Sequence, residues 1–519
     1  MVVTKTAPPT DLARGEAIFF FGSVAVERGG VTRAVLSRIR LFAEQGIKVR
    51  LLLSAYRFRE DEEEAELRRI WQLSPSVEFR YFWREAVPGG AGAGAPVPGA
   101  DSSREPGLTA FPPTAWGIGS VIRFYRDGLL VKSKFLTPDG RLHRIDHVDS
   151  ARRVTAREYF DGANRLIFTD QINPATNKPT LRRFFARSGV CWLTIWLNSA
   201  GREEQAVVHE PTPVAYEHFG DLFAEWADRI LAESDSPVIF SDARVWDRAA
   251  LSVRHPGARR VAVLHNCHTA KPYRGSDQTR STWQVFAENV ETFDAVVTLT
   301  HRQRDHLVER FNASNVTVIN HPAHPARIQP AERKPARLIA IARLEYQKRL
   351  DHAIRAFGIA VEKVPEARFD IFGSGVKTAA LQALVSELGL ADKVIFNGFT
   401  RNPLQEFATS QATVLSSWYE GFPLVLTEAM AVGTPFVAYD INYGPAEVIR
   451  NGVDGILVPP GDIAAMGAAL AKILGDPQYA RRLGERAREV GTRFSEQRWA
   501  TEWTSLYAKL VGDSKQAGR

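Results

Sequence analysis

The fold is decided by residues 416–430, which read SSWYEGFPLVLTEAM and follow an apolar run at residues 412–415. That run is typical of a buried strand, and Pro423 favours a helix start, because proline lacks an N–H that the first turn leaves unpaired anyway. Glu420 then lies in the loop after the strand, and Glu428 lies in the first turns of the helix. Free N–H groups at a helix N-terminus can hold a phosphate. The stretch therefore predicts a nucleotide-sugar site; a loop glutamate and a solvated helix glutamate are the alternative.

Two cations occupy a second strand-to-helix loop upstream. Residues 338–342 form another apolar run, and Arg343 and Lys348 follow it before a helical pattern begins. The fork of an arginine and the point charge of a lysine suit a diphosphate, which must be held while the sugar departs. Each cation alone is more often an ordinary surface charge. Together with Glu420 and Glu428, the pair favours a site for a nucleotide sugar.

Arg343 and Lys348 followed by Glu420-x7-Glu428 resembles the retaining glycosyltransferases of the GT-B fold that use nucleotide sugars. The resemblance covers the whole C-terminal half, with Asp454 where the usual residue is asparagine. The N-terminal half, with its β-rich insert, resembles more narrowly the wall teichoic acid α-glycosyltransferases. It also resembles their relatives that glycosylate serine-rich surface proteins. The fold implied is α/β: two Rossmann-like domains with an inserted antiparallel sheet.

The resemblance also implies roles for individual residues. It assigns catalysis to Glu420, His265, Arg343 and Lys348. It assigns donor binding to Gly29, Gly30, Arg343, Lys348, Phe399, Gly421, Phe422, Pro423, Leu424 and Glu428. His265 directly follows a predicted strand, where a side chain faces the ligand crevice of an open α/β sheet, and His268 is the alternative. We expect no metal and no cofactor besides the UDP-sugar donor, because the cations and the helix N-terminus make a divalent ion unnecessary.

Five segments are expected along the chain. Turn signals such as Asp127-Gly128, with alternating segments between them, predict a meander of hairpins inserted into the first α/β domain. The predicted divisions are a first Rossmann-like part at 1–117, the insert at 118–215, a second Rossmann-like part at 216–325, the nucleotide-sugar domain at 326–495 and a helix crossing back at 496–519. Within the first part, the acidic run 60–66 is interpreted as the solvated face of a helix. Leu67, Ile70 and Trp71 would dock that helix on the domain. Residues 88–117 are interpreted as a flexible linker.

The insert has a surplus of positive charge, with 14 Lys and Arg against 7 Asp and Glu over residues 121–190. A basic sheet face in water is one interpretation, and a docking surface for a polyanion is the other. We assign acceptor docking to Arg152, Arg153 and Arg157. The resemblance further implies assembly through this sheet into a homo-oligomer, a trimer. Several basic patches on one assembly would bind a long polyanion more tightly than one patch alone.

The composition and charge of the chain lead to expectations about its cellular compartment and its partners. The chain has 519 residues, a net charge of +7 and two cysteines, which is too few for a disulfide framework. No secretory signal is evident, so a cytoplasmic setting is expected, at most at the inner face of the membrane. Arg33, Arg38 and Arg40 lie on the first predicted helix among apolar residues. We interpret them as the solvated side of a helix packed on its sheet, so membrane contact would be at most peripheral.

The sequence therefore predicts a retaining α-glycosyltransferase. It would transfer a hexose or N-acetylhexosamine from UDP-glucose or UDP-GlcNAc to an anionic polyol-phosphate polymer of the wall. No nucleic-acid partner is expected. Two alternatives remain open: an O-glycosyltransferase that acts on serine-rich proteins, and a non-catalytic partner subunit with the same fold.

Overall fold

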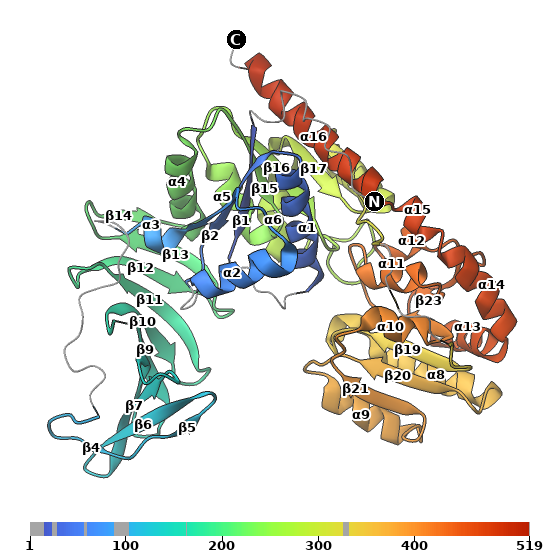
Figure 1. Cartoon of the computed structure of the whole chain (residues 1–519), viewed down its shortest axis with the longest axis horizontal. Helices are drawn as coiled ribbons and strands as arrows, with labels where there is room; N and C mark the ends of the chain where they lie inside the picture. Colours follow the sequence, from blue (N-terminus) through green and yellow to red (C-terminus); the bar gives the residue numbers. More distant parts are fainter. Residues whose placement is uncertain are drawn as a thin grey trace.

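The structure is a computed structural model that describes residues 15–22, 29–56, 60–87, 103–161, 163–324, 328 and 332–517. It has an N-terminal lobe and a C-terminal lobe, each built on a parallel sheet, and an insert that extends away from the N-terminal lobe (Figure 1). This arrangement confirms the predicted α/β class with an inserted antiparallel sheet. Among the described residues, no helix combines the length and the apolar character needed to cross a membrane.

The N-terminal lobe has a seven-stranded parallel sheet in the order β18-β17-β16-β15-β1-β2-β3. Strand order reverses between β1 and β15, and ligands bind outside the carboxyl ends of strands at such a point. The elements of the lobe are β1 (Gly15–Phe21), α1 (Gly30–Glu44), β2 (Lys48–Leu53), α2 (Glu60–Trp71), β3 (Val77–Tyr81), α3 (Phe82–Glu85), α4 (Phe219–Leu231), β15 (Ser236–Ser241), α5 (Asp247–Ser252), β16 (Arg259–Leu264), α6 (Gln284–Glu288), β17 (Ala295–Thr298), α7 (His301–Phe311) and β18 (Val316–Val318).

The C-terminal lobe repeats this plan with six parallel strands in the order β21-β20-β19-β22-β23-β24. Its switch point lies between β19 and β22, the two strands whose following loops carry the predicted cations and Glu420. The elements are β19 (Arg337–Ile341), α8 (Leu350–Lys363), β20 (Arg368–Phe372), α9 (Thr378–Glu387), β21 (Val394–Gly398), α10 (Pro403–Ala408), β22 (Ala412–Leu415), α11 (Leu424–Ala431), β23 (Phe436–Tyr439), α12 (Pro445–Val448), β24 (Gly455–Val458), α13 (Ile463–Gly475), α14 (Pro477–Ala487) and α15 (Val490–Arg493).

The insert is one eleven-stranded antiparallel sheet. Its strands are β4 (Thr109–Ala110), β5 (Thr114–Trp116), β6 (Gly119–Arg126), β7 (Leu129–Leu136), β8 (Leu142–Val148), β9 (Val154–Phe160), β10 (Leu166–Asn173), β11 (Lys178–Phe185), β12 (Cys191–Leu197), β13 (Glu203–Val208) and β14 (Val214–Tyr216). Strands β10 to β13 share a hydrophobic core with α3 and α4, where the rings of Trp83 and Phe184 stack 3.7 Å apart. The base of the insert is therefore part of the N-terminal lobe. The predicted trimer stays a prediction.

Three expectations about the first 117 residues are wrong. Arg38 is 2% exposed instead of solvated, because it pairs with a buried carboxylate. On α2, Glu60 is buried against Arg84, 2.7 Å away, while Ile70 is 43% exposed and does not dock. The predicted linker contains β4 and β5, which pair with β6; residues 88–102 of it lie outside the described part of the chain.

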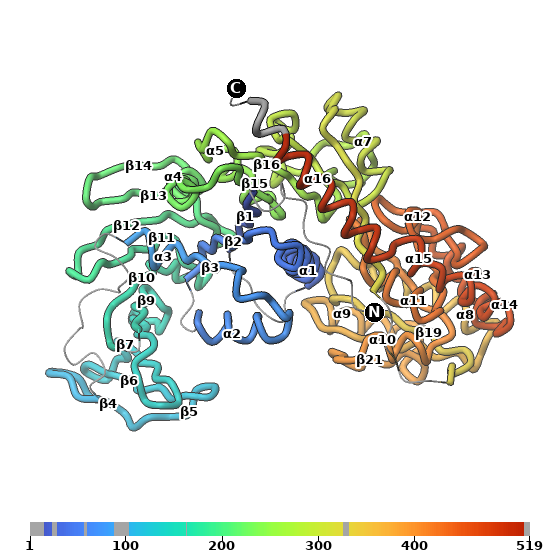
Figure 2. Tube along the Cα trace, turned by 45° about the horizontal axis from the view of Figure 1, so that its top comes forward, coloured from blue at the N-terminus to red at the C-terminus, as the bar shows by residue number. Residues whose placement is uncertain are grey.

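The chain crosses between the lobes twice, and the two crossings lie together. The first leads from β18 to β19, and the second leads into α16 (Glu496–Ala517), which runs from the C-terminal lobe onto the N-terminal lobe (Figures 1 and 2). The N–H of Ala323 donates to the carbonyl of Phe494 over 2.8 Å, and His324 meets Glu496 at 2.5 Å. Beyond this contact, Tyr507 of α16 packs into the core of the N-terminal lobe.

Candidate functional site

The predicted phosphate clamp and the predicted sugar carboxylate touch one another. Lys348 Nζ lies 2.6 Å from Glu420 Oε1, and the Ser417 hydroxyl donates to the same oxygen over 2.7 Å. Lys348 ends a 3₁₀ turn, Tyr346–Lys348, and Glu420 follows β22. Adjacent strands β19 and β22 bring these loops together at their carboxyl ends. An ammonium has three donors, so two remain for an anion.

Arg343 lies five residues before Lys348, in the same loop after β19. It is exposed, and among the described residues its guanidinium has neither a hydrogen-bond partner nor an ion pair. The loop after β20 lies against the backbone of Ala342, the residue before Arg343. A Cβ on Gly373 would come 1.9 Å from the carbonyl oxygen of Ala342. Glycine is therefore required there for close approach. The guanidinium is free to receive a bidentate anion, as predicted for a diphosphate.

Helix α11 begins at Leu424, four residues after Glu420. Pro423 precedes it with φ −66° and ψ 107°, an extended conformation that leaves the first N–H groups of the helix directed outward. Gly421 and Phe422 lie just before it, and Leu424 touches the start of α1, 3.3 Å from where a Cβ on Gly30 would be. Glu420, which contacts Lys348, thus lies on the segment that leads directly into this helix.

Glu428 contacts the opposite lobe through a residue that the sequence did not assign to the site. Arg33 Nη1 of α1 lies 2.9 Å from Glu428 Oε1. Arg33 lies three residues after Gly30, in the first turn of the helix that heads the cleft, and this position is the signal that could have identified it. Because Arg33 bonds only one of the two carboxylate oxygens, Glu428 keeps acceptor capacity for a ribose hydroxyl.

The two candidate histidines differ in their surroundings. His265 follows β16, and its Nε2 lies 2.7 Å from Asp242 Oδ1. Its backbone faces Gly421, where a Cβ would meet the His265 carbonyl oxygen at 2.1 Å. His268 is completely buried beside Tyr443, and neither ring nitrogen has a partner among the described residues. Burial lowers the pKa of His268 to about 3, so this ring stays neutral. The geometry favours His265 as the residue near the predicted donor site.

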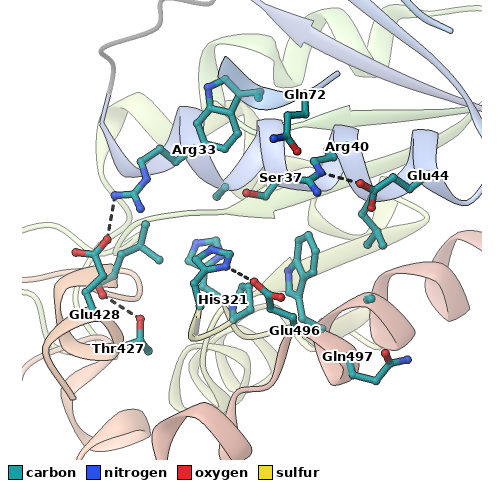
Figure 3. A pocket seen from close by; sticks show the side chains of 18 of the residues that line it. Arg33, Ser37, Arg40, Glu44, Gln72, His321, Thr427, Glu428, Glu496 and Gln497 are labelled. Carbon is teal, nitrogen blue, oxygen red and sulfur yellow. Dashed lines mark hydrogen bonds and ion pairs between the residues drawn. The ribbon is translucent and has the colours of Figure 1, made fainter. Parts of the chain in front are cut away.

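A groove of about 1960 Å³ runs along α1 between the lobes. Figure 3 shows Arg33 reaching Glu428 at one end, with Ser37, Arg40 and Glu44 along one side and His321, Glu496 and Gln497 along the other. The groove includes Leu424 and Glu428 but not Arg343, Lys348, Glu420 or His265. It therefore leads to the edge of the predicted donor site rather than enclosing it.

Phe399 and the three arginines of the insert are the remaining residues predicted for the site. Phe399 is 80% exposed after β21, beyond Gly398, whose φ is +69°. On the insert, Arg153 pairs with Asp149 at 2.8 Å, and Arg157 is bonded to the side chain of Asn177 and is 16% exposed. Arg152 is exposed on the same turn as Arg153. Arg152 and Arg153 thus present charge to solvent, whereas Arg157 is largely committed within the sheet.

Among the described residues, no group of three or more His, Cys, Asp and Glu side chains is arranged to hold a metal ion.

Residues 326–490 match the family model for glycosyl transferases group 1. Over 255 residues the chain is 36% identical to an exopolysaccharide phosphotransferase of Streptomyces coelicolor, a match that covers 49% of this chain and 26% of that protein. Over 410 residues it is 26% identical to a poly(glycerol-phosphate) alpha-glucosyltransferase of Bacillus subtilis, covering 76% of this chain and 57% of that protein. The chain thus spans less than two thirds of the length of either relative.

Among solved structures, a TarM variant of Staphylococcus aureus in complex with fondaparinux, alpha-GlcNAc-glycerol and UDP is similar over nearly the whole chain. The TM-score is 0.76 at 17% identity, with 95% of this chain and 99% of that chain covered. Identity this low shows the fold alone, and the fold is GT-B. Residues 326–490 therefore carry a group 1 glycosyltransferase domain within a chain that has the GT-B fold.

Proposed function

We propose that the protein transfers a hexose or N-acetylhexosamine from a UDP-sugar to a polyol-phosphate polymer of the teichoic acid type, with retention of the α configuration. The observation that carries the proposal is the contact of Lys348 with Glu420, with the exposed Arg343 in the same loop as Lys348. The relative that acts on poly(glycerol-phosphate) supports the acceptor class, and the UDP-bound structure of the same fold supports the nucleotide. The donor would be UDP-glucose or UDP-GlcNAc.

Each residue has a role that follows from its position. Arg343 and Lys348 neutralise the departing diphosphate together with the N-terminus of α11, while Glu428 accepts hydrogen bonds from the ribose. Glu420 orients the donor sugar, and His265 contacts it. In front-face transfer the leaving phosphate takes the proton of the acceptor hydroxyl, so no separate protein base is needed. The loops at Gly29 and Phe399 border the donor phosphates and the base.

The direct test supplies purified protein with labelled UDP-sugars and three acceptors: poly(glycerol-phosphate), poly(ribitol-phosphate) and a serine-rich peptide. We expect label on a polymer and an α-anomeric product by NMR. Transfer to the peptide alone would replace the proposed acceptor with protein. Failure to transfer from any UDP-sugar, with UDP still bound, would favour a non-catalytic subunit.

Catalysis is expected to continue without a divalent ion. In this proposal two side-chain cations and a helix N-terminus bind the diphosphate, and they supply the charge that a metal would otherwise bring. We therefore predict the same initial rate, within about twofold, after dialysis against EDTA. Loss of activity that Mn²⁺ or Mg²⁺ restores would contradict this prediction.

Acceptor docking should depend on the exposed turn of the insert. Reversing Arg152 and Arg153 to glutamate replaces two positive charges on that turn with two negative ones, and binding of a polyanion weakens when cations that neutralise its phosphates are removed. We expect KM for polymer to rise several-fold, while slow hydrolysis of UDP-sugar stays unchanged. The matched control reverses Arg481 and Arg482, which are exposed on α14. Equal KM values for polymer in the two double variants would show that the insert has no role in acceptor binding.

A further inference from the structure

A buried chain of polar groups lies behind His265 and belongs entirely to the N-terminal lobe and α16. Arg38 Nη2 of α1 lies 2.5 Å from Asp242 Oδ2, and Asp242 Oδ1 lies 2.7 Å from His265 Nε2. The side chains of Arg38 and Asp242 are each 2% exposed. Asp242 follows β15 and His265 follows β16, so two adjacent parallel strands set the spacing between carboxylate and imidazole.

Arg38 is confined by aromatic rings rather than by water. Its guanidinium carbon lies 5.0 Å from the ring centre of Phe19, 4.8 Å from that of Phe240 and 4.3 Å from that of Trp503. Trp503 belongs to α16, the helix that crosses from the other lobe. A buried charge is stabilised by a charged partner, so Arg38 favours Asp242 as a carboxylate. Burial alone would raise the pKa of Asp242, but Arg38 and His265 hold that pKa below its usual value.

The ionised carboxylate determines where His265 carries its proton. A carboxylate can only accept hydrogen bonds, so Nε2 of His265 must donate to it, and a ring with one proton then has Nδ1 as an acceptor. Nδ1 has no hydrogen-bond partner among the described residues, although the side chain is only 6% exposed. The ring of His265 also stacks on the ring of His321, with centroids 5.6 Å apart. The ring of His321 is in turn nearly perpendicular to that of Phe422, with centroids 5.7 Å apart. The orientation of the imidazole is therefore fixed from several sides.

We infer that Asp242 is a positioning residue: backed by Arg38 and Trp503, it holds His265 in the Nε2–H tautomer and leaves Nδ1 to accept a hydrogen bond from a donor-sugar hydroxyl. The inference rests on the proposed function for the identity of the ligand. The tautomer itself is a property of the free protein and can be measured without any substrate.

The first test is Asp242→Asn, read by ¹⁵N NMR of protein labelled at histidine, with the His265 signals identified by their loss in His265→Gln. Arg38 keeps the single carbonyl oxygen of the asparagine, so the amide NH₂ faces His265 and donates to Nε2. We expect Nε2–H in the wild type and Nδ1–H in the variant. A wild-type ring protonated at Nδ1, or an unchanged tautomer in the variant, would overturn the inference even if the protein is an active glycosyltransferase.

The second readout is kinetic. Asp242→Asn should lower kcat for sugar transfer at least about tenfold, because the wrong tautomer presents N–H where an acceptor is needed. Affinity for UDP should stay within about twofold, since the C-terminal lobe holds the nucleotide, and Asp242→Glu should restore part of kcat. Asp247→Asn is the matched control: this buried carboxylate bonds Ser241 and Arg244 in the same lobe. An equal loss of kcat in the control would assign the effect to packing and overturn the positioning role.

The two readouts separate this inference from the proposed function. If wild-type protein transfers no sugar, the proposed function fails, while the tautomer measurement still decides whether Asp242 positions the ring. If transfer is normal and Asp242→Asn shifts the tautomer without lowering kcat, then Nδ1 accepts no catalytically useful bond and the inference fails alone.

Discussion

Replacing Lys348 with alanine is expected to lower kcat/KM for sugar transfer by on the order of 10²–10³. Lys348 supplies a fixed charge 2.6 Å from Glu420, next to the position proposed for the departing diphosphate. Its removal withdraws a preorganised cation from the leaving group and leaves Glu420, which is 8% exposed, without its counter-ion. Both effects raise the barrier, because a buried carboxylate without its counter-ion is held less firmly by the Ser417 hydroxyl alone.

Lys363→Ala provides the matched control for this prediction. Lys363 is exposed at the end of α8, the helix that begins just after Lys348. Steady-state kinetics should show wild-type kcat/KM for the control, and calorimetry should show weaker UDP binding for Lys348→Ala only. A folded Lys348→Ala variant with wild-type turnover would exclude the lysine from the site, and the same result for Glu420→Ala would exclude the carboxylate.

Adding a single methyl group at Gly421 is expected to cost about 10² in kcat/KM. A Cβ there would lie 2.1 Å from the carbonyl oxygen of His265 and 2.8 Å from the backbone nitrogen of Asn266. Both are backbone atoms of the opposite lobe, so no side-chain rotation can relieve the overlap. The φ of Gly421 lies outside the left-handed region, so alanine at this position would add no backbone strain, and the effect would come from holding the lobes apart.

Gly421→Ala should therefore lose turnover while UDP affinity stays within about threefold, because most of the residues proposed to bind the nucleotide belong to the C-terminal lobe. Gly491→Ala is the control, since a Cβ at that position would have open space around it. Steady-state kinetics and calorimetry of UDP binding, measured on both variants, test this prediction. Wild-type kcat/KM in Gly421→Ala would show that the approach of His265 to Gly421 is not part of the active arrangement.

The sequence predicted local signals well because they depend on neighbours in the chain. Pro423 marks the start of α11, and the Asp127-Gly128 turn joins β6 to β7, with positive φ at both residues. The two cations that follow β19 were likewise found from the strand-to-helix pattern. In each case the chemistry follows from a few adjacent residues, which is what pattern reasoning can evaluate.

Contacts between distant segments could not be predicted in the same way. Arg38 and Asp242 are 204 positions apart, and Arg33 and Glu428 are 395 positions apart. An arginine on an amphipathic helix is normally solvated, and only the fold shows that Asp242 and Trp503 make burial of Arg38 tolerable. Strands β4 and β5 were missed because they have two and three residues, and the side chains of β5 are exposed. Such short strands form because they pair with β6, and no sequence pattern of their own identifies them.

The two crossings between the lobes have a mechanical consequence. The N–H of Ala323 donates to the carbonyl of Phe494, so the two connections are tied to each other where they pass between the lobes. A change in the angle between the lobes would therefore have to be accommodated on either side of this bond. Any such change would also alter the contacts of Gly421 with His265 and of Glu428 with Arg33, because each of them joins the two lobes.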